Sequence, residues 1–509
     1  MRLASVFVLL LLSSFAFAQK KTKVRLVRAD ELSPATYHSQ QVQKLSGDVV
    51  FKHNNTLMYC DSAYFYEGEN TLDAFGHIHI NDRDSVQIYA DTLRYFGDTR
   101  LAELHGNVVL KDKKMTLTTQ HLRYNMQTKV AFYYTGGKII NQDNVLTSIF
   151  GYYHSTIKTL YFHKDVLLVN PEYKMISDTL IYNTSTEVSY FRGPTNIISK
   201  ENSIYCERGW YDTKTNQSRY QYHSMLKNKT QTLTADSLFY DRNLSFGRAF
   251  KEVELIDTVQ NIILKGQYAE YYEKGRGSFV TDSSLAILVS KEKDSLYLHA
   301  DTLRINFDSS RKAKEFMAYN KVKFFKKDVQ GMCDSMVYLF DDSLLVMYQQ
   351  PLLWGSHSQL SGKIIRARMV NKKMDKVYID TNAFVMQHDT LEYYNQVSGR
   401  NMIAYFHNDS IQKVDVLGNA QSVYFVRDED SSLVGVNLGS SSDIRIEFSA
   451  GGISDIVYIN KPLASLNPID KVSKRALYLR GFKSYYYLQP KTKNEIFIFK
   501  AGLHKELEN

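Results

Sequence analysis

A tyrosine recurs at a fixed interval through the first half of the chain. The evenly spaced tyrosines are Tyr95, Tyr124, Tyr153, Tyr182, Tyr211 and Tyr240. Many of them close a segment of the type Ala-Asp-Thr-Leu-x-Tyr, most clearly at residues 90–95 and 235–240. Self-similarity at such a period is typical of stacked repeats, which together bury a core that one copy could not form alone. We therefore predict an elongated solenoid with a repeat of about 29 residues.

The residues between the tyrosines favour β-strands. Each early copy carries a glycine followed by β-branched or aromatic residues, as at Gly47, Gly76, Gly106 and Gly136, and this pattern indicates a turn followed by a half-buried strand. Polar segments at residues 52–55, 81–84 and 111–114 are typical of hairpins. We find no helical periodicity between residues 41 and 425. The sequence thus predicts an all-β fold of stacked antiparallel rungs over residues 41–425.

One position of each copy always holds a small residue. It directly precedes the repeated Asp and includes Cys60, Cys206 and Cys333, which are all the cysteines of the chain. Stacked strands would place these cysteines too far apart for disulfides, so we predict three buried free thiols. The repeated Asp residues, such as Asp61 and Asp91, are predicted to bond locally to the backbone where a strand begins.

The two ends of the sequence differ from the repeats. Residues 1–18 combine Arg2, an apolar run and a small-x-small motif, which predicts a signal peptide cleaved before Gln19 and hence export. Residues 19–40 are interpreted as an N-terminal leader. Residues 426–509 are predicted to hold further strands, one short helix over residues 468–480 and a terminal cap or partner-binding tail.

Composition and motifs narrow the function. Aromatic residues make up 13% and charged residues 23% of the 509 residues, which excludes a disordered chain. No later segment is apolar enough for a membrane-spanning helix. There is no phosphate-binding loop, nucleophile elbow or Cys/His metal spacing. We therefore expect no enzyme activity, no metal and no cofactor, and predicted export argues against nucleic acid as a partner.

Several segments together resemble a known family. The segments are residues 45–51, 60–64, 76–80, 90–95 and 105–110. They are similar to the OstA-like (LptA-like) lipopolysaccharide-transport family, most clearly over residues 45–128 and more weakly to residue 425. The resemblance implies a slightly open β-jellyroll (β-taco) whose interior receives acyl chains. It also implies a periplasmic location, with possible association with the outer membrane, and pairing of edge strands with other transport components.

The inward-facing residues of the rungs are the candidate lipid contacts. They are Val49, Phe51, Ile78, Ile80, Val108, Leu110 and Ile139. Exposing an acyl chain of about twelve methylenes to water costs roughly 10 kcal/mol, so an apolar groove would lower the barrier to crossing an aqueous compartment. The alternative for each residue is a closed core. Removal of Arg2 with the predicted signal peptide changes the formal charge from +9 to +8, which suits an anionic headgroup of lipopolysaccharide or a lipid A-like molecule.

The predicted function is therefore the binding and transport of lipopolysaccharide between the inner and outer membranes. The alternative is an exported β-solenoid that acts as a scaffold or binds glycans without moving lipid. A lipid carrier requires an open apolar channel, whereas a scaffold requires only a closed core.

Overall fold

The computed structural model describes residues 22–82, 86–272, 277–290, 294–309, 312–355, 357–371, 373–389, 392–428, 430–449 and 452–499. The chain divides into two compact units, unit 1 (Met1–Ile198) and unit 2 (Ser199–Asn509). Within the described ranges there are thirty-four β-strands and four short 3-10 helices, and no α-helix. The predicted all-β fold class is confirmed. The predicted signal peptide lies outside the described residues.

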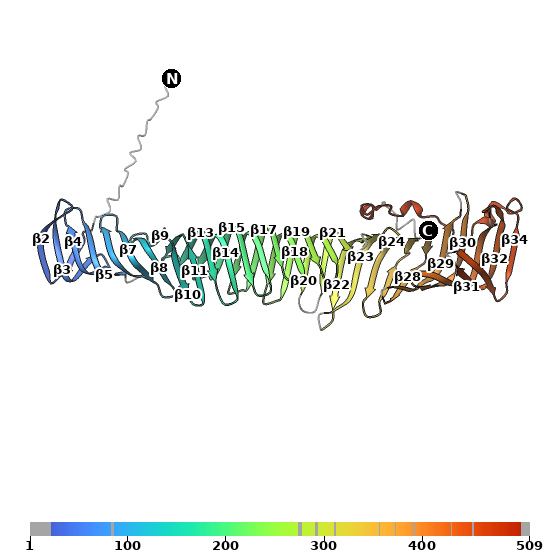
Figure 1. Cartoon of the computed structure of the whole chain (residues 1–509), viewed down its shortest axis with the longest axis horizontal. Helices are drawn as coiled ribbons and strands as arrows, with labels where there is room; N and C mark the ends of the chain where they lie inside the picture. Colours follow the sequence, from blue (N-terminus) through green and yellow to red (C-terminus); the bar gives the residue numbers. More distant parts are fainter. Residues whose placement is uncertain are drawn as a thin grey trace, which may run out of the picture. The chain divides into compact units, whose positions relative to one another are not determined.

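The strands of unit 1 run antiparallel to their partners, and most of them pair with the next strand in the chain (Figure 1). They are β1 (Arg25–Arg28), β2 (Glu31–Tyr37), β3 (Gln40–His53), β4 (Thr56–Tyr66), β5 (Thr71–Asp82), β6 (Gln87–Phe96), β7 (Leu101–Lys111), β8 (Thr116–Asn125), β9 (Val130–Tyr133), β10 (Gly137–Asn141), β11 (Asn144–Ser148), β12 (Phe150–His154), β13 (Thr159–Val169), β14 (Tyr173–Asn183) and β15 (Val188–Ser199). The first two strands lie in the segment predicted as a leader and pair with β3.

Unit 2 continues the same strand pattern. Its strands are β16 (Ser203–Asp212), β17 (Gln217–Lys227), β18 (Gln231–Asp241), β19 (Phe246–Asp257), β20 (Ile262–Tyr272), β21 (Ser278–Leu288), β22 (Leu296–Phe307), β23 (Ala313–Phe325), β24 (Val329–Leu339), β25 (Leu344–Tyr348), β26 (Leu352–Gly355), β27 (Ser358–Ser361), β28 (Ile364–Val370), β29 (Lys373–His388), β30 (Tyr394–His407), β31 (Ser410–Arg427), β32 (Leu433–Ser449), β33 (Gly452–Ile459) and β34 (Leu463–Asn467). The 3-10 helices are η1 (Ile469–Lys471), η2 (Lys474–Leu477), η3 (Tyr486–Leu488) and η4 (Glu495–Phe497).

The repeated tyrosines form a column in each unit. In unit 1 the paired positions run through Tyr95, Ala102, Tyr124, Ala131, Tyr153, Leu160 and Tyr182, each opposite the next. In unit 2 they run through Tyr211, Ser218, Tyr240, Gly247 and Tyr271. One period of the tyrosines therefore equals two strands and their hairpins, so the predicted repeat length is confirmed within each unit.

Gly47, Gly76 and Gly106 lie inside strands, whereas Gly136 lies between β9 and β10, which both pair with β8. Gly76 and His77 have φ values of 75° and 41° in the middle of β5, where the register with β4 shifts. Gly47/Asp48 and Gly106/Asn107 have the same geometry, and the later pairs Lys164/Asp165, Tyr222/His223 and Lys251/Glu252 also have positive φ. Two successive left-handed residues bend the strand. The prediction of a turn is wrong at Gly47, Gly76 and Gly106, because each of these glycines marks a corner that folds one strand onto two faces.

The corner glycine of β7 makes a close approach that predicts a stability effect. A Cβ atom at Gly106 would lie 2.4 Å from Asp91 Oδ2, and its φ is +75°. We expect Gly106→Ala to lower the free energy of unfolding by about 1–3 kcal/mol, measured by urea denaturation. Gly68→Ala is the matched control, because nothing lies within 4 Å of its added Cβ. Equal unfolding midpoints for the two variants would contradict this prediction.

The repeated Asp residues bond across the corner rather than locally. Asp91 Oδ2 accepts a hydrogen bond from Asn107 Nδ2 at 2.8 Å, and Asp61 Oδ2 lies 2.7 Å from His77 Nδ1. In unit 2, Lys321 Nζ lies 3.1 Å from Asp301 Oδ2. The predicted bonding to local backbone is therefore wrong at these positions, since the partner is the corner side chain of the next strand.

The three cysteines are free and buried, as predicted. Burial raises the pKa of Cys60 and of Cys206 to about 12. In the register, Cys60 lies opposite Val49, and Cys333 lies opposite Val322. The small residue thus accommodates a branched side chain just after the corner of the neighbouring strand.

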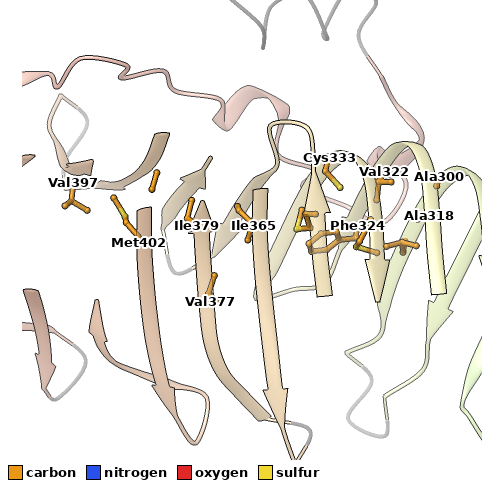
Figure 2. Packing of buried hydrophobic residues seen from close by; sticks show 14 of the residues in the cluster. Ala300, Ala318, Val322, Phe324, Cys333, Ile365, Val377, Ile379, Val397 and Met402 are labelled. Atoms are coloured by element: carbon orange, nitrogen blue, oxygen red, sulfur yellow. The ribbon is translucent and has the colours of Figure 1, made fainter. Parts of the chain in front are cut away.

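The core of unit 2 is built from the inner faces of its folded strands. Figure 2 shows Phe324, Ile365 and Met402, which come from β23, β28 and β30 and belong to one buried cluster. Alternate residues of each strand point into this cluster, as expected for strands with one buried face.

Residues 468–499 form an extended segment, here named the C-terminal strap, that runs back over unit 2 (Figure 1). Three buried glutamines bind it. Gln396 Nε2 donates to Leu477 O at 2.8 Å, Gln359 Nε2 donates to Lys483 O at 2.9 Å, and Gln330 Oε1 accepts from Gln489 Nε2 at 2.7 Å. The predicted helix over residues 468–480 is wrong, because only the short η1 and η2 occur there.

Candidate functional site

The seven predicted contact residues lie on adjacent inner rows of unit 1. One row joins Phe51, Met58, Ile80, Ile88, Leu110, Leu117 and Ile139, each paired with the next. Beside it, Val49 is paired with Cys60, Ile78 with Ala90, and Val108 with Thr119. The alternation of the sequence therefore placed all seven side chains on the inner face.

These side chains are fully enclosed in the described structure. Exposure is 0% for Val49, Phe51, Ile80 and Leu110, 1% for Ile78 and Val108, and 3% for Ile139. A second inner row, beyond the corner, supplies further apolar residues, and it includes Leu45, Ala63, Ala74, Leu93, Leu104 and Leu122. The interior of these repeats is thus packed as a core. Contact of the seven residues with lipid stays a prediction.

Contacts across the fold show that the two edges of the sheet meet. Tyr124 lies near the C-terminal end of β8, beside the hairpin that leads to β9, whereas Asp82 ends β5 at the opposite set of hairpins. A straight strand of this length would keep its ends roughly 36 Å apart. Tyr124 Oη nevertheless donates to Asp82 Oδ2 at 2.7 Å. The sheet is therefore folded over at its corners, and we call the two hairpin edges edge A (the side of Asp82) and edge B (the side of the tyrosine column).

Among the described residues, three contacts that each include a tyrosine of the column, here named latches, join edge A to edge B. The first joins Tyr95 Oη to His53 Nδ1 at 2.6 Å. The second joins Tyr124 and Lys129 to Asp82, and the third joins Tyr153 and Lys158 to Asp112. Asp82 is 3% exposed and Tyr124 is 0% exposed. The latches are thus buried polar bridges across the open side of the fold.

The third latch holds its carboxylate ionised. Burial alone would raise the pKa of Asp112, but hydrogen bonds from Tyr153 and Lys158 outweigh burial and place that pKa below its ordinary value. Burial and the bond to Asp112 raise the pKa of the Tyr153 phenol well above its usual range. The proton therefore stays on the tyrosine, and the carboxylate accepts from both partners.

The first latch predicts a pH effect. Burial lowers the pKa of His53 below its ordinary 6.5, and nearby Arg100 lowers it further. Below pH 6.5, His53 therefore binds a proton in the unfolded chain but stays neutral in the folded chain. The free energy of unfolding is highest above pH 6.5 and decreases as the pH falls toward the lowered pKa. The loss is about 1.4 kcal/mol for each pH unit by which the pKa is lowered. We expect His53→Gln to reduce this acid dependence in urea denaturation between pH 7.5 and 5.5, and parallel curves would contradict the prediction.

Unit 2 has an inner row of its own, and none of its residues is among the seven predicted contact residues. It joins Ile204, Leu226, Leu233, Leu255 and Leu264, each paired with the next. All five are only half-buried. Leu226 and Leu233 pack against the cluster of Ala235, Leu238, Ala249 and Val253. The same alternation extended past residue 200 could have identified these leucines.

The described ranges contain neither a candidate metal cluster nor a helix able to cross a membrane. Among those residues, no group of three or more His, Cys, Asp or Glu side chains could hold a metal ion. Within the same ranges, no helix has the length and apolar character needed to cross a membrane.

Part of the chain matches the model of a known protein family. Residues 21–178 and 176–236 match a family model described as OstA-like protein. The matched part covers unit 1 and the first strands of unit 2, including all three latches and the seven predicted contact residues. No curated protein matches the chain.

Proposed function

We propose that this chain binds lipopolysaccharide or a lipid A-like lipid and shields its acyl chains inside the folded sheet. Residues 21–236 belong to the OstA-like family, whose β-structures are related to lipopolysaccharide transport. The observation that carries the proposal is that, in each unit, apolar inner residues of successive strands are paired with one another in a continuous row. Shielding of this kind needs only binding, so the proposed action involves no catalysis.

The proposed action includes a relay between membranes. The first strands of unit 1 and the last strands of unit 2 expose apolar side chains, with Leu32 55%, Leu463 74% and Leu466 55% exposed. Exposed strand edges pair readily with a strand of another protein. We propose that these strands join other lipopolysaccharide-transport components in the periplasm, so that lipid passes between the inner and outer membranes.

The test is transfer of a fluorescent lipid A from vesicles to the purified full chain. We expect saturable transfer that unlabelled lipopolysaccharide competes away and that polysaccharide stripped of its acyl chains does not. Binding of the stripped polysaccharide without any lipid transfer would overturn the proposal and favour a glycan-binding scaffold.

A further inference from the structure

The chemistry of edge A changes along the repeats. The latch positions His53, Asp82 and Asp112 are followed, at the repeat spacing, by Asn141, Asn170 and Ser199. Edge B changes in parallel, since the cation five residues after each latch tyrosine is Arg100, Lys129 or Lys158, whereas the next repeat has Glu187. The latches built on a column tyrosine thus end at the third repeat, and at the next repeat Glu187 of edge B instead lies 4.0 Å from Lys114 Nζ of edge A.

In later repeats, the residues at the latch position of edge A form hydrogen bonds within their own hairpins. Asn170 Oδ1 accepts hydrogen bonds from the backbone N–H groups of Glu172 and Tyr173, at 2.8 and 2.9 Å. In unit 2, Asn228 Oδ1 accepts from Thr230 N at 2.9 Å and from Gln231 N at 2.7 Å. These side chains cap local turns and do not reach across the fold as Asp82 does.

The burial of the inner row differs between the latched repeats and unit 2. In the latched repeats, Phe51, Ile80 and Leu110 are 0% exposed. In unit 2, the row from Ile204 to Leu264 has the same inward direction, yet every member is half-buried. Inward-facing aliphatic side chains that are only partly buried leave apolar surface uncovered, and covering such surface is favourable by about 25 cal/mol per Å².

We propose that acyl chains bind to unit 2 along the row of Ile204, Leu226, Leu233, Leu255 and Leu264, and that the latches keep the first three repeats closed to lipid. This inference rests on the proposed function and states which part of the chain contacts the acyl chains. The latched interior is packed and bridged by buried ionic contacts, so a chain could enter it only if the latches opened. The row in unit 2 presents apolar surface without that step.

The experiment uses the full chain and a lipid A that carries a diazirine on one acyl chain. After irradiation, the crosslinked peptides are mapped by mass spectrometry. We expect adducts within residues 204–264 and none within residues 49–139. Excess lipopolysaccharide should suppress the adducts, whereas polysaccharide without acyl chains should not.

Two matched pairs of variants sharpen the test. Leu255→Gln places a polar group on the inner row and should lower the adduct yield about tenfold, whereas Ile256→Gln, on the opposite face of β19, should not. Tyr124→Phe combined with Tyr153→Phe removes two latch hydroxyls without changing side-chain shape. This double variant should gain adducts within residues 104–122, and Tyr182→Phe is its control from the same column beyond the third latch.

The outcomes separate the two proposals. Adducts within residues 49–139 of the unmodified chain would overturn the placement in unit 2 while supporting lipid binding. Adducts confined to peptides outside both inner rows would also overturn the placement. Absence of any adduct in correctly folded protein would overturn the placement and the proposed function together.

Discussion

Trp354→Ala is expected to destabilise unit 2 by about 3–5 kcal/mol and to release the C-terminal strap. Trp354 is 0% exposed and packs with Met332, Leu352 and Leu488. Leu488 belongs to the strap, whereas the other three residues belong to β24 and β26. Removing the indole therefore takes away both core volume and the surface on which the strap is anchored.

Trp354→Phe is the matched control for this substitution. The indole Nε1 is buried without a hydrogen-bond partner in the described structure, so replacing the indole with a phenyl ring breaks no hydrogen bond and costs much less than alanine. Urea denaturation measures stability, and hydrogen exchange of the amides of residues 477–489 reports release of the strap. If the protection of these amides is unchanged in Trp354→Ala, the strap is held mainly by the buried glutamines of the strands.

The strap also shows why its conformation could not be predicted from local sequence. Asn467 and Pro468 are good residues for a helix start, and the prediction of a helix depended on them. The backbone of this segment is instead bound by Gln396 and Gln359, whose amides each accept from one strap N–H and donate to one strap carbonyl. These partners lie far from the strap in the chain, so tertiary contacts override local propensity.

The repeat was the most predictable feature because it depends on register. Two strands and two hairpins take up 29 residues in each repeat from Tyr95 to Tyr240, so the tyrosine returns to the same place in the sheet. The corner was misread because glycine before β-branched residues has the same sequence pattern at a turn and at a mid-strand bend. Later corners such as Tyr222/His223 use no glycine, which removed the signal that would have shown a bend in every copy.

The inner face of the candidate site was predictable, but its closure was not. Alternation alone assigns Phe51, Ile80 and Leu110 to the inside, because side chains of a strand alternate between faces. The latch between Tyr124 and Asp82 joins residues 42 positions apart, and this pairing exists only once the sheet is folded over. A combined search for the tyrosine period, an acid or histidine on edge A and a cation on edge B would have indicated three latches.

Asp82→Ala is expected to be among the most damaging single substitutions in unit 1, with a loss of about 3–5 kcal/mol. The substitution leaves the Lys129 ammonium, which is 28% exposed, without its counter-ion and leaves the buried Tyr124 hydroxyl without its acceptor. An uncompensated charge in a partly buried site costs more than the intact pair contributes. Asp112→Ala should cost less, because its partner Lys158 is 36% exposed and can be hydrated more readily.

A second substitution distinguishes charge imbalance from lost packing. In Asp82→Leu combined with Lys129→Met, the apolar pair leaves no charge unpaired, so most of the stability lost in Asp82→Ala should return. Urea denaturation of the single and double variants measures the difference. If the double variant is as unstable as Asp82→Ala, the latch stabilises the fold through its hydrogen bond to Tyr124 and not through ion pairing. Recovery of stability would instead show that the ionic latches contribute chiefly to keeping the two edges of the sheet in one register, at little net gain in free energy over an apolar contact.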